Sequence, residues 1–220
     1  MPSSDAESLT PSQSLTKLHH LLSMHAPDYP IRDPDLLDTG TIGLVSNVIG
    51  HFASCIINHT LTKEETSYLD AGFRHELTTP NEIAGAEYLR KRTHDFLETL
   101  SNVKELKLSE LDTVVGVLYF IRYLEKTYNE PRFLDYAEVD SILVVSIMVA
   151  YKYMNEEHQS HGVTPLFCRL LSVSSVLLSS EATFLQKLDF RLNVQDSELL
   201  RLVEIIRSFP CSSAASHLQN

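Results

Sequence analysis

The run of residues 139–154, which reads VDSILVVSIMVAYKYM, constrains the fold more than any other part of this chain. It is apolar nearly all the way round a helix and ends beside a single cation, Lys152. A helix without a polar face has no side to turn toward water, so it must lie inside a bundle of other helices. We therefore predict an all-α protein with a central helix from about Glu138 to Met154.

The rest of the chain supplies helices to surround this one, and no segment favours a strand. Capping-box patterns, in which a serine or threonine precedes an acidic residue by three positions, mark helix starts at Thr62 and Ser109. A further helix is expected to start at Asn81 or Thr79, either of which can act as its cap. The core stripe of the helix after Thr79 is expected to be Ile83, Ala86, Leu89, Phe96, Leu97 and Leu100. The other expected helices are Thr41 to Asn58, Leu166 to Leu171, Ser174 or Ser175 to Leu188, and one capped by Asp196.

These elements form one domain, because the sequence holds no internal repeat. Residues 1–34 are rich in proline, serine and threonine and are expected to be a flexible segment, with a short helix from Ser14 to His25 that docks or frays. Residues 35–209 are expected to be the folded domain, and residues 210–220 a tail.

Composition excludes several classes of protein. The formal net charge is −11, which argues against nucleic acid or an anionic membrane as the main partner. The three cysteines are widely spaced and odd in number, which is typical of a reducing compartment. The N-terminus lacks the pattern of a signal peptide, and the apolar run Ile142 to Ala150 is far shorter than the roughly 20 residues of a membrane span. We expect a soluble, intracellular protein in the cytoplasm, the nucleus or both.

Enzyme motifs are absent from the sequence. There is no phosphate-binding glycine loop, no Gly-x-Ser-x-Gly elbow and no acid–base pair. His158 and His161 lie three residues apart, but no further cysteine or histidine pair stands at zinc spacing. The sequence therefore predicts no metal, no cofactor and no catalytic residues.

Lys152 and a later glutamate, Glu181, admit two interpretations. In the first, the lysine in the last turn of its helix is stabilised by the helix dipole and by the last carbonyl groups, and Glu181 simply faces solvent or pairs with Lys152. Alternatively, Lys152 and Glu181 are a pair of polar groups on an otherwise apolar face, suited to gripping a partner. Spacing alone does not decide between the two, and the flanking Tyr151 and Tyr153 can be core aromatics in either case.

Four blocks of the sequence together resemble the cyclin family, and most closely its PHO80-like branch, the P- or U-type cyclins. SIMVAYKYMNEE, from Ser146, matches the family's Ser-x-Met-Val-Ala-x-Lys-Phe block, and LSSEATFLQKLDFRLNV, from Leu178, matches its glutamate block. TPNEIAGAEYLRKR, from Thr79, and LYFIRYLEK, from Leu118, are similar to two earlier blocks. The family's aspartate before Arg122 is replaced here by Ile121.

The resemblance implies a five-helix cyclin box with flanking N- and C-terminal helices. It implies a regulatory subunit that binds and activates a cyclin-dependent kinase, PHO85-like or another, by gripping its C-helix. Lys152 and Glu181 match the family's pair that hydrogen-bonds the kinase backbone there. The matching apolar positions around the pair are Val149, Tyr153, Leu185, Phe190 and Leu192.

Two other functions compete with this one. A cyclin-fold adaptor or scaffold would bind a non-kinase partner, and it has no need of the lysine–glutamate pair. A small helical hydrolase would need a nucleophile, a metal or an acid–base pair, and the sequence offers none.

We predict that residues 1–13 and 212–220 contribute little to stability, because both stretches are polar, serine-rich and without periodicity. Deleting both should leave the melting temperature, followed by circular dichroism, within a few degrees of that of the full chain. A large drop would show that one of the ends docks on the domain.

Overall fold

The computed structural model describes residues 37–58, 76–104, 106–127, 136–155, 162–170 and 176–209. Within them the protein has seven α-helices and no strand, so the all-α prediction is confirmed there. The expected segment 1–34, the helix start at Thr62, the histidines His158 and His161, and the tail lie outside the described residues. The helices are α2 (Thr39–Ile57), α4 (Pro80–Ser101), α5 (Glu110–Thr127), α6 (Tyr136–Met154), α7 (Val163–Leu170), α8 (Val176–Lys187) and α9 (Asp196–Ser208).

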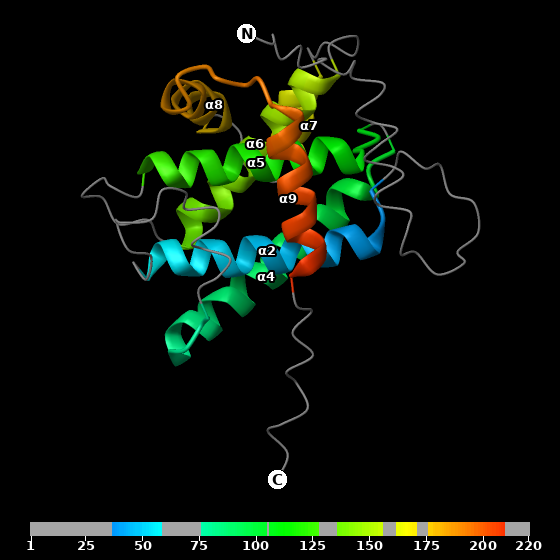
Figure 1. The fold of residues 1–220 in the computed structure, drawn as a ribbon. Coiled ribbons are helices and arrows are strands. Elements are labelled where there is room, and N and C mark those ends of the chain that lie inside the picture. Colours follow the sequence, from blue (N-terminus) through cyan, green and yellow to red (C-terminus); the bar gives the residue numbers. More distant parts are fainter. Residues whose placement is uncertain are drawn as a thin grey trace, which may run out of the picture.

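Two pairs of long helices form the body of the domain (Figure 1). α2 packs along α4, and α5 packs along α6. α9 crosses both α5 and α2 and so ties the two pairs together, while α7 and α8 pack against α6. α5 therefore touches helices on several sides, which places it at the centre of the described bundle.

The predicted central helix is buried as expected. Ile147 and Met148 of α6 are fully enclosed, Leu143 is 3% exposed, and Ile142 lies at the edge of the core at 9%. The apolar pattern all round α6 thus reflects packing on several sides, mainly against α5 and also against α8, α7 and α4.

Of the two predicted caps for α4 the structure has Thr79, which forms a full capping box, and the capping box predicted at Ser109 is also present. The Thr79 hydroxyl accepts a hydrogen bond from the Glu82 N–H, and the Glu82 carboxylate accepts one from the Thr79 N–H at 2.8 Å. The Ser109 N–H likewise donates to Asp112 at 2.9 Å, and the Asp112 N–H donates back to the Ser109 hydroxyl. These contacts satisfy N–H groups that have no partner within their own helices.

Several details of the sequence prediction were wrong. Ile83, expected in the core stripe of α4, is 53% exposed, because the buried face of that helix begins at Glu82 and Gly85. α7 begins at Val163 and ends at Leu170, earlier than expected. α9 takes Gln195 rather than Asp196 as its N-cap residue.

The helix that most resembles a membrane span in length and hydropathy is not the one that the sequence analysis considered. α2 is long and apolar enough to cross a membrane by length and composition, although the apolar run singled out in the sequence lies in α6. However, 67% of the residues in its most apolar window are buried inside the bundle. Its apolar composition is therefore accounted for by packing against α4, α5 and α9.

Glycines allow both helix pairs to approach closely. A Cβ added at Gly50 of α2 would lie 2.5 Å from the Ala86 carbonyl oxygen of α4. One added at Gly116 of α5 would overlap the side chain of Ile147 and lie 3.0 Å from its Cα atom in α6. Only glycine fits at these two positions without moving a neighbouring helix.

We predict that Gly116→Ala destabilises the fold by about 1–3 kcal/mol, because the added methyl group overpacks the contact with Ile147. Adding Ile147→Val, which removes the clashing terminal methyl group, should recover part of the loss. Urea unfolding followed by circular dichroism measures both free energies of unfolding.

Gly43 of α2 provides the matched control, because a Cβ there would meet nothing within 4 Å. Gly43→Ala should stabilise the protein by about 0.5–1 kcal/mol through helix propensity. Equal effects of the two glycine substitutions would contradict the close contact between α5 and α6.

Candidate functional site

Lys152 and Glu181 lie 29 residues apart in the sequence and form an ion pair in the structure. The Lys152 ammonium, in the last turn of α6, donates to Glu181 Oε1 at 2.7 Å and Oε2 at 2.8 Å from α8. Their side chains are 22% and 18% exposed, so the pair lies at the surface but is largely shielded from water. The ammonium therefore bridges two helices, and this contact agrees with a structural role for the pair as well as with a role in gripping a partner.

The pair retains hydrogen-bonding capacity. An ammonium group has three N–H donors, and each carboxylate oxygen has two lone pairs. Glu181 is the only partner of Lys152 within the described part of the chain, and Lys152 the only partner of Glu181. One N–H and several lone pairs can therefore meet a carbonyl group and an N–H group of another molecule.

Exposed aromatic side chains accompany the pair. Across the described residues four large hydrophobic side chains are exposed, and two of them, Tyr153 at 40% and Phe190 at 67%, belong to the predicted site. Leu185 and Leu192 are partly buried against the core. Val149 is only 3% exposed, so in this structure it belongs to the core beneath the site rather than to its surface.

The polypeptide between α8 and α9 displays Phe190. The Phe190 N–H donates to the Leu185 carbonyl at 2.9 Å, and the Asp189 N–H donates to the Gln186 carbonyl at 3.0 Å. This is the Schellman pattern of a helix end, in which an apolar residue after the helix packs on one in its last turns. Leu185 and Phe190 occupy those two positions, which explains why two predicted site residues lie together.

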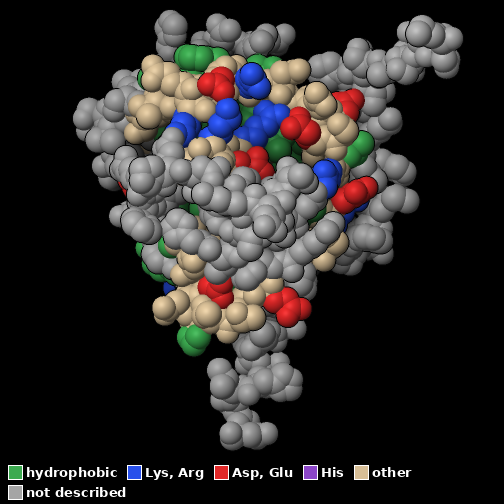
Figure 2. All heavy atoms as spheres, turned by 60° about the vertical axis from the view of Figure 1, so that its left-hand side comes forward, with side chains coloured by type: hydrophobic (Ala, Val, Ile, Leu, Met, Phe, Trp, Pro, Cys, Tyr) green, Lys and Arg blue, Asp and Glu red, His purple; other side chains and the backbone are tan. Residues whose placement is uncertain are grey.

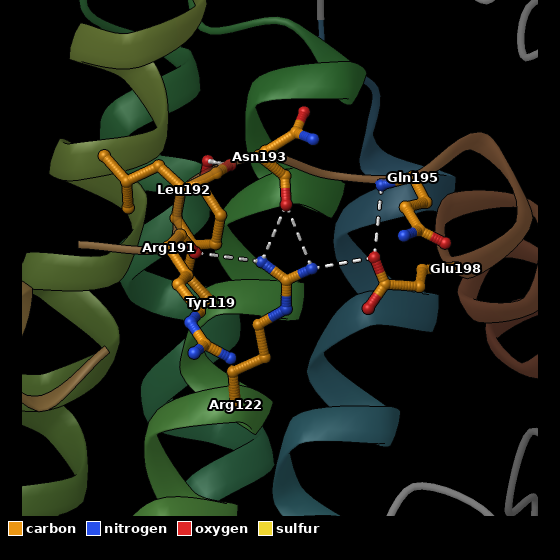
Figure 3. Close-up of polar contacts among 7 residues, drawn as sticks. All are labelled: Tyr119, Arg122, Arg191, Leu192, Asn193, Gln195 and Glu198. Carbon is orange, nitrogen blue, oxygen red and sulfur yellow. Dashed lines mark hydrogen bonds and ion pairs between the residues drawn. The ribbon is translucent and has the colours of Figure 1, made fainter. Parts of the chain in front are cut away.

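One face of α5 holds the same segment in place (Figure 3). The Tyr119 hydroxyl donates to the Leu192 carbonyl at 2.5 Å, and Arg122 reaches the Arg191 and Asn193 carbonyl groups, each at 3.2 Å. Burial raises the pKa of the Tyr119 hydroxyl, and the nearby Tyr153 adds to the effect. Tyr119 thus links the segment after α8 to the exposed ring at the end of α6.

Basic side chains lie near the turn after α8, although the chain as a whole carries a net negative charge. Lys126 of α5 binds Asp189 at 2.7 Å, and this ion pair lowers the pKa of the Asp189 carboxyl group. Arg191 is exposed two residues further on. Figure 2, which brings the α8 side of the molecule forward, shows Lys and Arg side chains collected on one part of the surface with Asp and Glu among them.

The described residues offer little catalytic chemistry elsewhere. Asp112 is buried, and burial raises its pKa, but its carboxylate already caps α5 and accepts from Asn155 at 2.9 Å. A cavity of about 660 Å³ beside α7 has a mainly apolar lining that includes Tyr151 and Arg169. No group of three or more metal-binding side chains occurs in the part of the chain that the structure describes.

The sequence prediction missed the residues that support the site. Arg122 and Tyr119 act on main-chain carbonyl groups, which leave no mark in a sequence pattern. The available signal was the helical spacing of Tyr119, Arg122, Tyr123 and Lys126, four side chains on one face of α5. Tyr123 uses this face to stack on Phe184 of α8, with ring centroids 5.1 Å apart.

Comparison with known proteins gave no relatives. No protein-family model, no curated protein and no solved structure matches this chain.

We predict that Lys152 and Glu181 are coupled in stability but are not essential for folding. Lys152→Ala or Glu181→Ala alone should cost about 1–2 kcal/mol, because each leaves a largely buried charge without its partner. The double variant should cost less than the sum and keep the helical circular-dichroism signal. Urea unfolding of the four proteins of this cycle measures the coupling, and strictly additive costs would contradict it.

Proposed function

We propose that this protein is the regulatory subunit of a cyclin-dependent kinase, PHO85-like or another, and that its described helices form a cyclin box with flanking helices. The observation that carries the proposal is the Lys152–Glu181 pair, brought together from α6 and α8. Tyr153, next to Lys152 in the sequence, and Phe190, in the turn after α8, are both exposed. The four sequence blocks that resemble PHO80-like cyclins agree with the proposal.

The geometry suits recognition of a helix end. The first N–H groups of a helix have no partner within the helix, and nearby turns offer carbonyl groups in the same way. Glu181 accepts and Lys152 donates, so together they can satisfy one group of each kind on a partner backbone. Tyr153 and Phe190 supply the apolar contact that surrounds such polar groups in binding sites.

Binding of this kind activates a kinase by a shift in population. A kinase is active when the lysine of its strand β3 pairs with the glutamate of its C-helix. Contacts that exist only when the C-helix is turned inward favour that state by their own free energy. The protein needs no catalytic residue or cofactor for this role.

A cyclin-fold adaptor for a non-kinase partner remains the alternative function. Ile83 and Tyr88 of α4 are exposed outside the predicted site and offer a second apolar surface. Affinity capture from cells followed by mass spectrometry distinguishes the two functions. Recovery of a cyclin-dependent kinase supports the proposal, and recovery of a non-kinase protein without any kinase supports the adaptor.

We predict that Lys152→Ala combined with Glu181→Ala weakens binding to a recombinant PHO85-like kinase by about 2–5 kcal/mol, because it leaves polar groups of the kinase unpaired in a desolvated contact. Kinase activity, followed by phosphate transfer to a peptide substrate, should fall in proportion to the bound fraction.

Arg92 and Asp140 provide the matched control. They form an ion pair at 2.9 Å between α4 and the start of α6, about 18 Å along α6 from Lys152. Replacing both by alanine should leave kinase binding unchanged. If the Lys152/Glu181 variant binds and activates as well as the unmodified protein while it remains folded, the pair is only an internal bridge.

A further inference from the structure

The turn after α8 has an unusual backbone. Asp189 and Phe190 adopt φ angles of 53° and 55°, in the left-handed region that glycine prefers. Aspartate visits this region readily, but a bulky residue such as phenylalanine does so only at a cost in free energy. Phe190 is 67% exposed, so burial within this chain does not offset the cost. Strain of this kind points to a functional role when the surrounding structure holds it in place.

Arg122 makes several hydrogen bonds to the segment that directly follows this turn (Figure 3). Its Nη1 atom donates to the carbonyl groups of Arg191 and Asn193, and its Nη2 atom donates to Asn193 and, at 2.7 Å, to the Glu198 carboxylate. Glu198 in turn accepts from the Gln195 N–H at 3.1 Å, at the start of α9. One guanidinium group thus contacts the connection at Arg191 and Asn193 and the first turn of α9 at Glu198, while Tyr119 and Lys126 contact Leu192 and Asp189.

The Arg122 side chain is well suited to this task. It is 20% exposed and lies over the Tyr119 ring, with its central carbon atom 6.0 Å from the ring centroid. The planar guanidinium group offers several N–H donors in a fixed arrangement, whereas a lysine offers one nitrogen atom. Only an arginine at this position can span two carbonyl groups and a carboxylate at once.

We infer that Arg122 is a positioning residue that holds the strained turn and thereby presents the Phe190 ring as an anchor for a partner. The positioning half of this inference concerns the protein alone. The anchoring half rests on the proposed function, because the partner is the kinase of that proposal.

The positioning half is tested on the full chain without a partner. The unmodified protein contains no tryptophan, so Phe190→Trp places a single fluorescent reporter on the turn. In this background Arg122→Gln should lower the steady-state anisotropy of the reporter. In the unmodified background, hydrogen exchange of the Asp189, Phe190 and Leu192 amides should accelerate about tenfold or more, because their hydrogen bonds open locally.

The core amides of α5 and α6 serve as the internal reference and should exchange at their original rates. Arg92→Gln is the matched control, because this arginine is 58% exposed and pairs with Asp140 away from the turn. If Arg122→Gln accelerates exchange everywhere alike, or nowhere, Arg122 is not a positioning residue. Should Arg122→Gln fail to fold, Arg122→Lys keeps the charge, cannot span the acceptors, and undergoes the same measurements.

The anchoring half is tested by a double-mutant cycle with a recombinant PHO85-like kinase. Arg122→Gln and Phe190→Ala should each weaken binding by about tenfold or more. In the Phe190→Ala background, Arg122→Gln should have almost no further effect, because it acts through the ring. Independent, multiplying effects would overturn the assignment of Phe190 as the anchor that Arg122 positions.

The measurements on the protein alone and the binding measurements with the kinase separate this inference from the proposed function. If the unmodified protein binds no cyclin-dependent kinase, the proposed function and the anchoring half fail together. The exchange and anisotropy measurements then still decide whether Arg122 positions the turn.

Discussion

The close contact between α5 and α6 at Gly116 and Ile147 is the constraint on which the candidate site depends. Because Gly116 lacks a side chain, α6 lies directly on α5 along its length, and the last turn of α6 takes a fixed place relative to α5. That turn carries Lys152, while α5 carries Arg122 and the other side chains that hold the segment after α8. Both halves of the site, the polar pair and the exposed turn, are therefore positioned by the same helix contact.

The sequence predicted the parts of this arrangement that depend on periodicity and local chemistry. The apolar pattern all round α6 identified a buried helix, and the candidate cap at Thr79 and the capping box at Ser109 marked helix starts, because these signals arise within a few residues. The same reasoning wrongly placed Ile83 in the core. Periodicity shows which residues form the apolar stripe of a helix, but it does not show which edge of that stripe a neighbouring helix covers. Helical spacing marks the face of α5 that carries Arg122, but it does not give the role of Arg122, because its partners are main-chain carbonyl groups about 70 residues away and that pairing exists only after folding.

The Lys152–Glu181 pair contributes less to stability than its short distances suggest. Removing two charges from water is costly, and the attraction between them repays that cost only in part. A pair built only for stability is therefore replaceable by apolar residues of similar size. A pair built for binding gains from being formed in advance, because less side-chain ordering remains to be done when the partner arrives. The pair is 22% and 18% exposed, so it lies at the surface, as the proposed function requires.

Phe190 carries the same argument further, because its conformation costs free energy in the protein alone. A left-handed backbone at a residue other than glycine costs roughly 1–2 kcal/mol. The hydrogen bonds of Arg122 and Tyr119 to the following segment contribute about 0.5–1.5 kcal/mol each, so they are sufficient to hold the turn.

These hydrogen bonds do not explain why residue 190 is phenylalanine. They do not involve the exposed ring, and asparagine or glycine would fit the left-handed backbone better. Burying the ring against another molecule is worth about 1.5–3 kcal/mol, which exceeds the strain. Under the proposed function, the partner would therefore account for the identity of the side chain, while α5 accounts for the backbone that presents it.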